Sequence, residues 1–450
     1  MLVPIHHTDR VVERHPESVV GDTWMTEVVP RLPAALAVQA RVLKAFQRVR
    51  GVATPADLLR AVLAYVLGAL STRRRGAWAV LIGLADISET AWRKRLRASN
   101  AWLLWLLGAL LAAPGPPASP AAPGSRRVRL IDATRLRHPG GTGDDWRVHF
   151  AYDCTAGRLD EVVGTEQHSA EHLTHCTLRP GDIAVADNGY GDRTSVATAV
   201  RQGADVVLRI TPATFPVETA AGQAYDLTAW LRQENTAQQE WQGWGVHDAQ
   251  RYAVRVLAAR LPPEVAARAR HRKSQQAQKH GRTPSATTLA LADWVLVATT
   301  LAAAWPLTDG RRLYRARWQV ALVLKRMKQL LRFNQLRRTH RTTVEATVRA
   351  LLVAWALQED IGAALQALLR ALTSPQPLVI SRWLVTGLGL DTLRQQVQRT
   401  WSRARLCLCL PRLQRFLCCR PRRRAQQETE VRAGLEGRIP RLFLIEEDAA

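Results

Sequence analysis

The sequence predicts an α/β protein in which a mixed β-sheet carries helices on its faces. Three short β-like runs, residues 128–133, 147–152 and 159–165, follow one another and are separated by glycine-containing turns. The runs 183–187 and 205–210 then alternate with helical stretches, and long helical patterns precede and follow the whole series. Strands that first pair locally and then alternate with helices are typical of such a sheet.

The composition favours a globular protein with a polyanionic partner. Hydrophobic residues make up 47% of the 450, which is enough for packed cores and excludes a disordered chain. Lys and Arg total 63 against 38 Asp and Glu, a net charge of +25. Such an excess favours nucleic acid, because clustered cations displace counterions from phosphates. Only six of the cations are Lys. A GC-rich genome that favours Arg codons explains part of this ratio but not the net excess.

The sequence shows no signal-peptide pattern or membrane span. Its most apolar run, 101–113, is shorter than the roughly 20 residues that a spanning helix needs. Four cysteines near the end, Cys407, Cys409, Cys418 and Cys419, lack the usual zinc spacing and are expected to be reduced thiols, a metal site being the alternative. We expect a cytoplasmic, nucleoid-associated protein with no membrane partner.

Changes in composition divide the chain into six regions. Residues 114–124 contain five Pro and two Gly, a composition typical of a semi-rigid linker. The predicted regions are a helical N-terminal DNA-binding domain (1–113), the linker (114–124), the first part of the core (125–210), a β-rich insertion domain (211–306), the core helices (307–372) and a basic C-terminal region for DNA binding or dimerisation (373–450).

The helical N-terminal region contains a candidate helix-turn-helix. A helix over 77–84, a break at 85–87 and a second helix carrying Arg93, Lys94 and Arg95 have the required order. In such a motif the second helix lies in the major groove of DNA. A plain helical bundle with a solvated basic face fits the same pattern.

Beyond residue 210 the pattern becomes less regular. Four further strands are predicted: 225–231, 241–246, 252–259 and 294–300. They surround a basic polar loop at 271–282. A turn at 308–310 then precedes a long helix over 311–333, and a second long helix spans 344–372.

Two acids stand at the ends of predicted strands. Asp132 ends the first β-like run and Asp187 ends the fourth. The carboxyl ends of neighbouring parallel strands meet at one edge of a sheet, so we expect the two carboxylates to lie side by side. In a strongly basic chain such a pair favours a site for Mg²⁺, which prefers oxygen ligands. Two such ions can promote phosphodiester cleavage. A capping or turn role for each Asp is the alternative.

The helix predicted over 311–333 carries an informative stripe. Tyr314, Arg317, Ala321 and Lys328 lie at offsets of 0, 3, 7 and 14, which place them on one face at 100° per residue. This spacing resembles the Tyr-x2-Arg-x3-Glu-x6-Lys signature of the bacterial insertion-sequence DDE transposases of family four. Further segments similar to that family are 131–136, 146–149, 180–190, 315–320 and 325–328.

The resemblance implies an RNase H-like core with helices on both faces, interrupted by an insertion domain. It implies that Asp132 and Asp187 bind metal, with two Mg²⁺ (or Mn²⁺) in the active form. It further implies cut-and-paste transposition through a hairpin at the transposon end, by a homodimer that pairs terminal inverted repeats and captures target DNA. Residues implied to contact DNA are Tyr314, Arg317, Lys328 and Trp294, the last by stacking on a flipped base; a core Trp is the alternative for Trp294.

The chain departs from the family at one position, because Ala321 stands where the signature has its catalytic Glu. Alanine cannot bind a metal, so we expect DNA binding with little or no cleavage. Two origins fit: a deliberate substitution, which the intact remaining motifs favour, or a natural copy that serves as a non-catalytic DNA-binding protein. A nuclease acting on RNA–DNA hybrids is a third hypothesis, but it needs neither the stripe nor the insertion.

Overall fold

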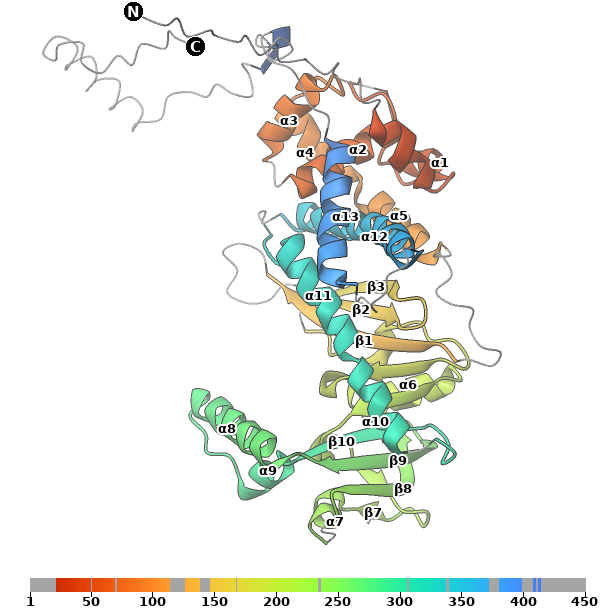
Figure 1. Ribbon diagram of the computed structural model, residues 1–450, viewed down its shortest axis with the longest axis vertical. Helices are drawn as coiled ribbons and strands as arrows, with labels where there is room; N and C mark the ends of the chain where they lie inside the picture. The colour runs from red at the N-terminus through yellow and green to blue at the C-terminus, as the bar shows by residue number, and fades with distance from the viewer. Residues whose placement is uncertain are drawn as a thin grey trace, which may run out of the picture.

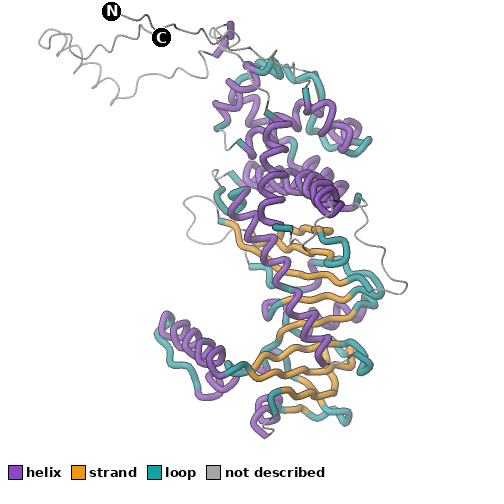
Figure 2. Tube along the Cα trace, in the orientation of Figure 1, coloured by secondary structure: helices purple, strands orange, loops and turns teal. Residues whose placement is uncertain are grey.

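The computed structural model describes residues 22–49, 51–68, 71–113, 126–137, 146–166, 168–233, 236–305, 307–336, 340–371, 380–398, 408–409 and 412–413. Helices gather at one end of an elongated molecule and strands at the other (Figure 2). The predicted α/β class, with a large mixed sheet and many helices, is confirmed.

The helices of the described residues are α1 (Leu36–Val42), α2 (Pro55–Leu67), α3 (Thr72–Leu81), α4 (Glu89–Ala98), α5 (Asn100–Ala112), α6 (Arg193–Arg201), α7 (Leu227–Gln233), α8 (Pro263–Lys279), α9 (Ala286–Leu291), α10 (Leu307–Ala316), α11 (Trp318–Leu330), α12 (Arg341–Ala371) and α13 (Arg382–Val397). The strands are β1 (Val128–Leu136), β2 (Trp146–Asp153), β3 (Arg158–Glu166), β4 (Ile183–Ala186), β5 (Asp205–Arg209), β6 (Val217–Glu218), β7 (Ala224–Tyr225), β8 (Gln238–His247), β9 (Gln250–Arg260) and β10 (Trp294–Thr299).

All ten strands form one sheet in the order β3-β2-β1-β4-β5-β10-β9-β8-β6-β7. Strands β1, β4 and β5 are parallel to one another, whereas β2 and β3 pair antiparallel beside β1. Strand β10 pairs antiparallel with β5 and joins β6–β9 to the same sheet. The region predicted as an insertion is therefore continuous with the central sheet.

Successive side chains of the central strands pack into two different hydrophobic cores. Leu130 and Val185 lie in one core with residues of α11, while Ile131 and Ala184 lie in a second core with residues of α6. Because side chains of a strand point alternately to the two faces, α10–α11 covers one face of the sheet and α6 the other (Figure 1).

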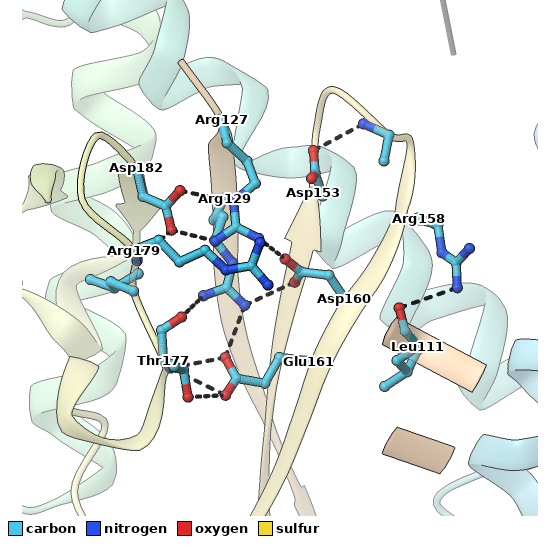
Figure 3. A network of polar contacts seen from close by, with 12 residues as sticks. Leu111, Arg127, Arg129, Asp153, Arg158, Asp160, Glu161, Thr177, Arg179 and Asp182 are labelled. Atoms are coloured by element: carbon cyan, nitrogen blue, oxygen red, sulfur yellow. Dashed lines mark hydrogen bonds and ion pairs between the residues drawn. The ribbon is translucent and has the colours of Figure 1, made fainter. Parts of the chain in front are cut away.

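The beginning of β1 is tied to its surroundings by a polar network (Figure 3). Arg129, which is 2% exposed, donates to Asp160 and Glu161 of β3, each at 2.9 Å. Arg127 pairs with Asp160 and with Asp182, directly before β4. These contacts join β1, β3 and the start of β4.

The helices at the two ends of the described chain pack together. Helix α12 contacts α5, α2, α4 and α13, and the core that contains Trp24 and Leu58 also contains Val353 and Leu390. The N-terminal helices therefore share one core with α12 and α13. Of the C-terminal cysteines only Cys409 lies within the described residues, where it is buried against α3.

Three local predictions are wrong. The predicted strand 225–231 is mostly helix α7, whose apolar Leu227, Trp230 and Leu231 follow helical spacing. The predicted loop 271–282 is largely the second half of α8, where Ala, Arg and Gln favour helix despite their polarity. The predicted turn 308–310 lies inside α10, so the long helix begins earlier than expected and is interrupted at Arg317.

Candidate active site

Asp132 and Asp187 lie side by side on the face of the sheet covered by α10 and α11. The parallel register pairs Ile131 with Ala186, so the two acids are the next residues along β1 and β4. Both continue the alternation of Leu130 and Val185 toward that face. Asp187 follows the last residue of β4, but β1 continues four residues beyond Asp132 to Leu136, so the prediction that Asp132 ends its strand is wrong. The pairing of β1 with β4 ends at Ile131, directly before Asp132.

Arg317, at the junction of α10 and α11, reaches both acids. Its Nη1 lies 3.8 Å from Asp132 Oδ2, and its Nη2 lies 3.6 Å from Asp187 Oδ2. The Tyr314 hydroxyl donates to Asp187 Oδ1 at 3.1 Å. Asp187 and Tyr314, which are 127 positions apart in the sequence, are thus brought into one site. Tyr314 and Arg317 share one face of the helix because they are three residues apart.

The electrostatics of the site favour a bound positive charge. Burial raises the pKa of Asp132, and the charges of Asp187 and Glu171 raise it further, whereas Arg317 opposes the shift. Burial, followed by the charge of Asp187, raises the pKa of Tyr314, which keeps its hydroxyl protonated as a donor. The guanidinium of Arg317 is the cation that faces both acids.

Glu171 is a third acid of this region, to which the sequence gave no role. Its Oε1 lies 3.6 Å from Arg147 Nε, and its carboxyl group packs so closely against Gly189 that a Cβ added there would clash with Oε2. It also contributes to the raised pKa of Asp132. It falls in a family-like segment of the sequence, but it lies on an irregular stretch between β3 and β4, where no helical or strand periodicity predicts its neighbours.

A cavity of about 620 Å³ begins at Asp187 and runs toward the outer strands. Its lining includes Arg209, Trp294 and Lys273. Trp294 is only 8% exposed and its ring lies 5.7 Å from the guanidinium carbon of Arg260, so it forms part of the wall.

The remaining predicted DNA-binding residues lie elsewhere. Lys328 is half-buried on α11, two turns beyond Ala321. On α4, at the helical end of the molecule, Arg93 and Lys94 are exposed, whereas Arg95 packs over the ring of Phe46 at 6.0 Å. The sequence did not single out Trp318, which is 63% exposed beside Arg317. The exposure of this indole beside Arg317 is a signal that only the structure supplies.

The stability of the protein is expected to depend on pH through His149, a buried residue next to this site. It is 1% exposed, its Nδ1 lies 2.7 Å from the Tyr190 hydroxyl, and its Nε2 lies 3.0 Å from the Thr165 hydroxyl. Burial, with smaller contributions from His175 and nearby cations, lowers the pKa of His149 to about 4. The folded protein therefore keeps His149 neutral, while the unfolded chain takes up a proton below pH 6.5 or so.

The free energy of unfolding is consequently expected to fall as the pH drops from about 6.5 to about 4, by up to ~3 kcal/mol from this residue. Urea unfolding across this pH range measures the slope. His149→Gln keeps a hydrogen-bonding side chain and should flatten the profile. His175 has a lowered pKa as well, so part of the slope should remain. Identical profiles for the two proteins would contradict this assignment.

Two carboxylates on neighbouring strands of a mixed sheet, beneath a helix that supplies tyrosine and arginine, are consistent with the class of RNase H-like α/β transposases. The chain belongs to the DDE transposase family, because the model described as "Transposase DDE domain" matches residues 123–357. It is 31% identical over 338 residues to the Escherichia coli transposase for insertion sequence element IS421, covering 73% of this chain and 91% of that protein. It is 32% identical over 337 residues to the InsL protein of insertion sequence element IS186A from Escherichia coli strain K12, covering 73% and 90%.

DDE transposase domains depend on metal, and the carboxylates of Asp132 and Asp187 are the oxygen donors that this chain presents beneath α10 and α11. Asp132 and Asp187 supply carboxylate oxygens, but Arg317 faces both of them and Ala321, one turn further along α11, offers no oxygen. Across the part of the chain that the structure describes, no group of three or more His, Cys, Asp or Glu side chains is placed to hold a metal ion. None of the described helices is long and apolar enough to cross a membrane.

Proposed function

We propose that this chain is a transposase of an insertion sequence that binds the terminal inverted repeats of its element and, as a homodimer, brings two ends together with target DNA. The observation that carries the proposal is the convergence of Asp132, Asp187, Tyr314 and Arg317 on one site where α10 and α11 cross β1 and the end of β4. A phosphodiester can approach this site, because the side chain of Asp187 is 41% exposed. The family of the chain supports the same conclusion.

The DNA contacts follow from the charge and position of each residue. Arg317, Tyr314 and Lys328, on one side of α10–α11, would bind phosphates of the transposon end. Trp294, in the wall of the cavity beside Asp187, would receive an unpaired base by stacking. The exposed cations of α4 would contact duplex DNA further from the cleavage site, and Arg95 would support them from the interior.

The chemistry proposed for the family core is cleavage, hairpin formation and strand transfer at the ends. In a form with glutamate at position 321, two Mg²⁺ or Mn²⁺ ions would be held beside Asp132 and Asp187. In the present chain Ala321 leaves this donor set incomplete, and we propose that strand cleavage is weak or absent. The alternative is a non-catalytic, transposase-derived DNA-binding protein, which the contact of Arg317 with both acids favours.

Binding to end DNA tests the proposal directly. The protein should bind a duplex of the inverted repeats that flank its reading frame more tightly than a scrambled duplex, and should protect the repeats in a footprint. Specific complexes are typically at least about a thousandfold tighter than non-specific ones. Binding should persist in EDTA, because Arg317 supplies a positive charge between the acids. Equal affinity for the two duplexes would overturn the proposal, and a preference for RNA–DNA hybrids would favour a nuclease instead.

A further inference from the structure

Helix α8 extends away from the sheet instead of lying on it (Figure 1). Of its 17 residues only Ala266 is buried. It carries five cations and one acid, Glu264, so it is strongly basic for a helix that contributes so little to the core. Any role of α8 beyond the fold therefore depends on its exposed surface.

The topology places α8 at the edge of the sheet that holds the paired acids. The helix follows the end of β9 and, with α9, precedes the start of β10. Strand β10 is antiparallel to β5, so it starts where β5 and its parallel neighbour β4 end, which is also where Asp187 lies. Lys273 of α8 lines the same cavity as Asp187, which confirms that the two face one space.

One side of α8 faces the rest of the protein. Arg270 pairs with Asp293, directly before β10. At 100° per residue, Ala266 and Arg270 lie on the side toward the protein, whereas Arg268, Arg272 and Lys279 lie within about 40° of one another on the opposite side. These three cations are all exposed.

We propose that α8 is a DNA-binding arm whose outer cations, Arg268, Arg272 and Lys279, hold the phosphate backbone of the duplex next to the reacting end. Along the helix axis the three are separated by about 6 and 10 Å at 1.5 Å per residue. One strand of B-DNA advances 3.4 Å per nucleotide, so neighbouring cations can reach phosphates one to three nucleotides apart. The contacts read charge and not sequence, and the arm therefore adds affinity without adding specificity. This inference rests on the proposed function, since it assigns a second surface to the same DNA.

A matched pair of double variants tests the arm. R268Q/R272Q removes two exposed outer cations, while R179Q/R201Q removes two exposed cations beside the starts of β4 and β5, at the opposite edge of the sheet. Affinity is measured by fluorescence anisotropy on the inverted-repeat duplex and on its scrambled counterpart across a salt series. Circular dichroism and sedimentation report folding and oligomeric state.

For R268Q/R272Q we expect roughly ten- to hundredfold weaker binding of both duplexes at 100 mM salt, and a slope of log K against log salt that is shallower by about 1.8. The ratio between the duplexes should not change, and R179Q/R201Q should match the parent. If R268Q/R272Q had the same salt slope as the parent, the proposed DNA-binding arm would be refuted. The preference for end DNA, and with it the proposed function, would stand. Loss of self-association without loss of DNA affinity would refute the arm too and identify α8 as a protein interface. If the parent protein bound both duplexes equally well, only the proposed function would be refuted. The change in salt slope caused by R268Q/R272Q would still test whether α8 binds DNA.

Discussion

Replacing Ala321 by Glu is expected to raise strand cleavage at end-containing duplex on the order of a hundred- to a thousandfold in the presence of Mg²⁺ or Mn²⁺. Ala321 lies one turn after Arg317 on the helix that covers Asp132 and Asp187. A carboxylate at this position would supply a third oxygen donor and would compete with the two acids for the guanidinium of Arg317, leaving both free to bind cations.

The experiment compares Ala321→Glu with Ala321→Gln, which has nearly the same size but no charge. Nicks and hairpins are counted on the inverted-repeat duplex, and Mn²⁺ affinity is measured independently by calorimetry. The Gln variant should cleave no better than the parent, and Asp132→Asn in the Glu background should abolish the gain. If the Glu variant showed neither tighter Mn²⁺ binding nor more nicks, position 321 would not belong to the cleavage site.

Removing the positive charge of Arg129 is expected to cost about 3 kcal/mol of the free energy of unfolding. Arg129 is 2% exposed, and its loss would take the guanidinium away from Glu161, whose side chain is 20% exposed, and would leave Asp160, whose side chain is 16% exposed, with Arg127 alone. Burial already raises the pKa of Asp160, so the loss of one of its two guanidinium partners is disfavoured.

Arg129→Met, which keeps much of the side-chain volume, isolates this charge effect in urea unfolding. The triple variant with Asp160→Asn and Glu161→Gln should regain most of the loss, because it leaves no unpaired charge. Arg341→Ala is the control: its pair with Glu166 is exposed, and it should leave the unfolding midpoint unchanged. A midpoint unchanged in Arg129→Met would show that the network does not stabilise β1.

Regular local patterns made much of the fold predictable. The strands around residues 130, 150 and 185 were found because apolar and β-branched residues repeat there between turns. The prediction failed at α7 because its short apolar run fits either helical or strand periodicity. It failed at α8 because the polar residues there still formed a helix. The extension of the sheet by β6–β9 also escaped prediction, because strand pairing joins residues that are distant in the sequence.

The sequence by itself determined the family and which residues share a face: Asp132 and Asp187 by their positions on strands, and Tyr314 and Arg317 by helical spacing. Only the tertiary structure decided that Arg317 faces both acids, that Glu171 lies close enough to affect the pKa of Asp132, and that Lys273 and Trp294 line a cavity with Asp187. The physical reason is that periodicity depends on backbone geometry within one element, whereas distances between elements depend on how the whole core packs.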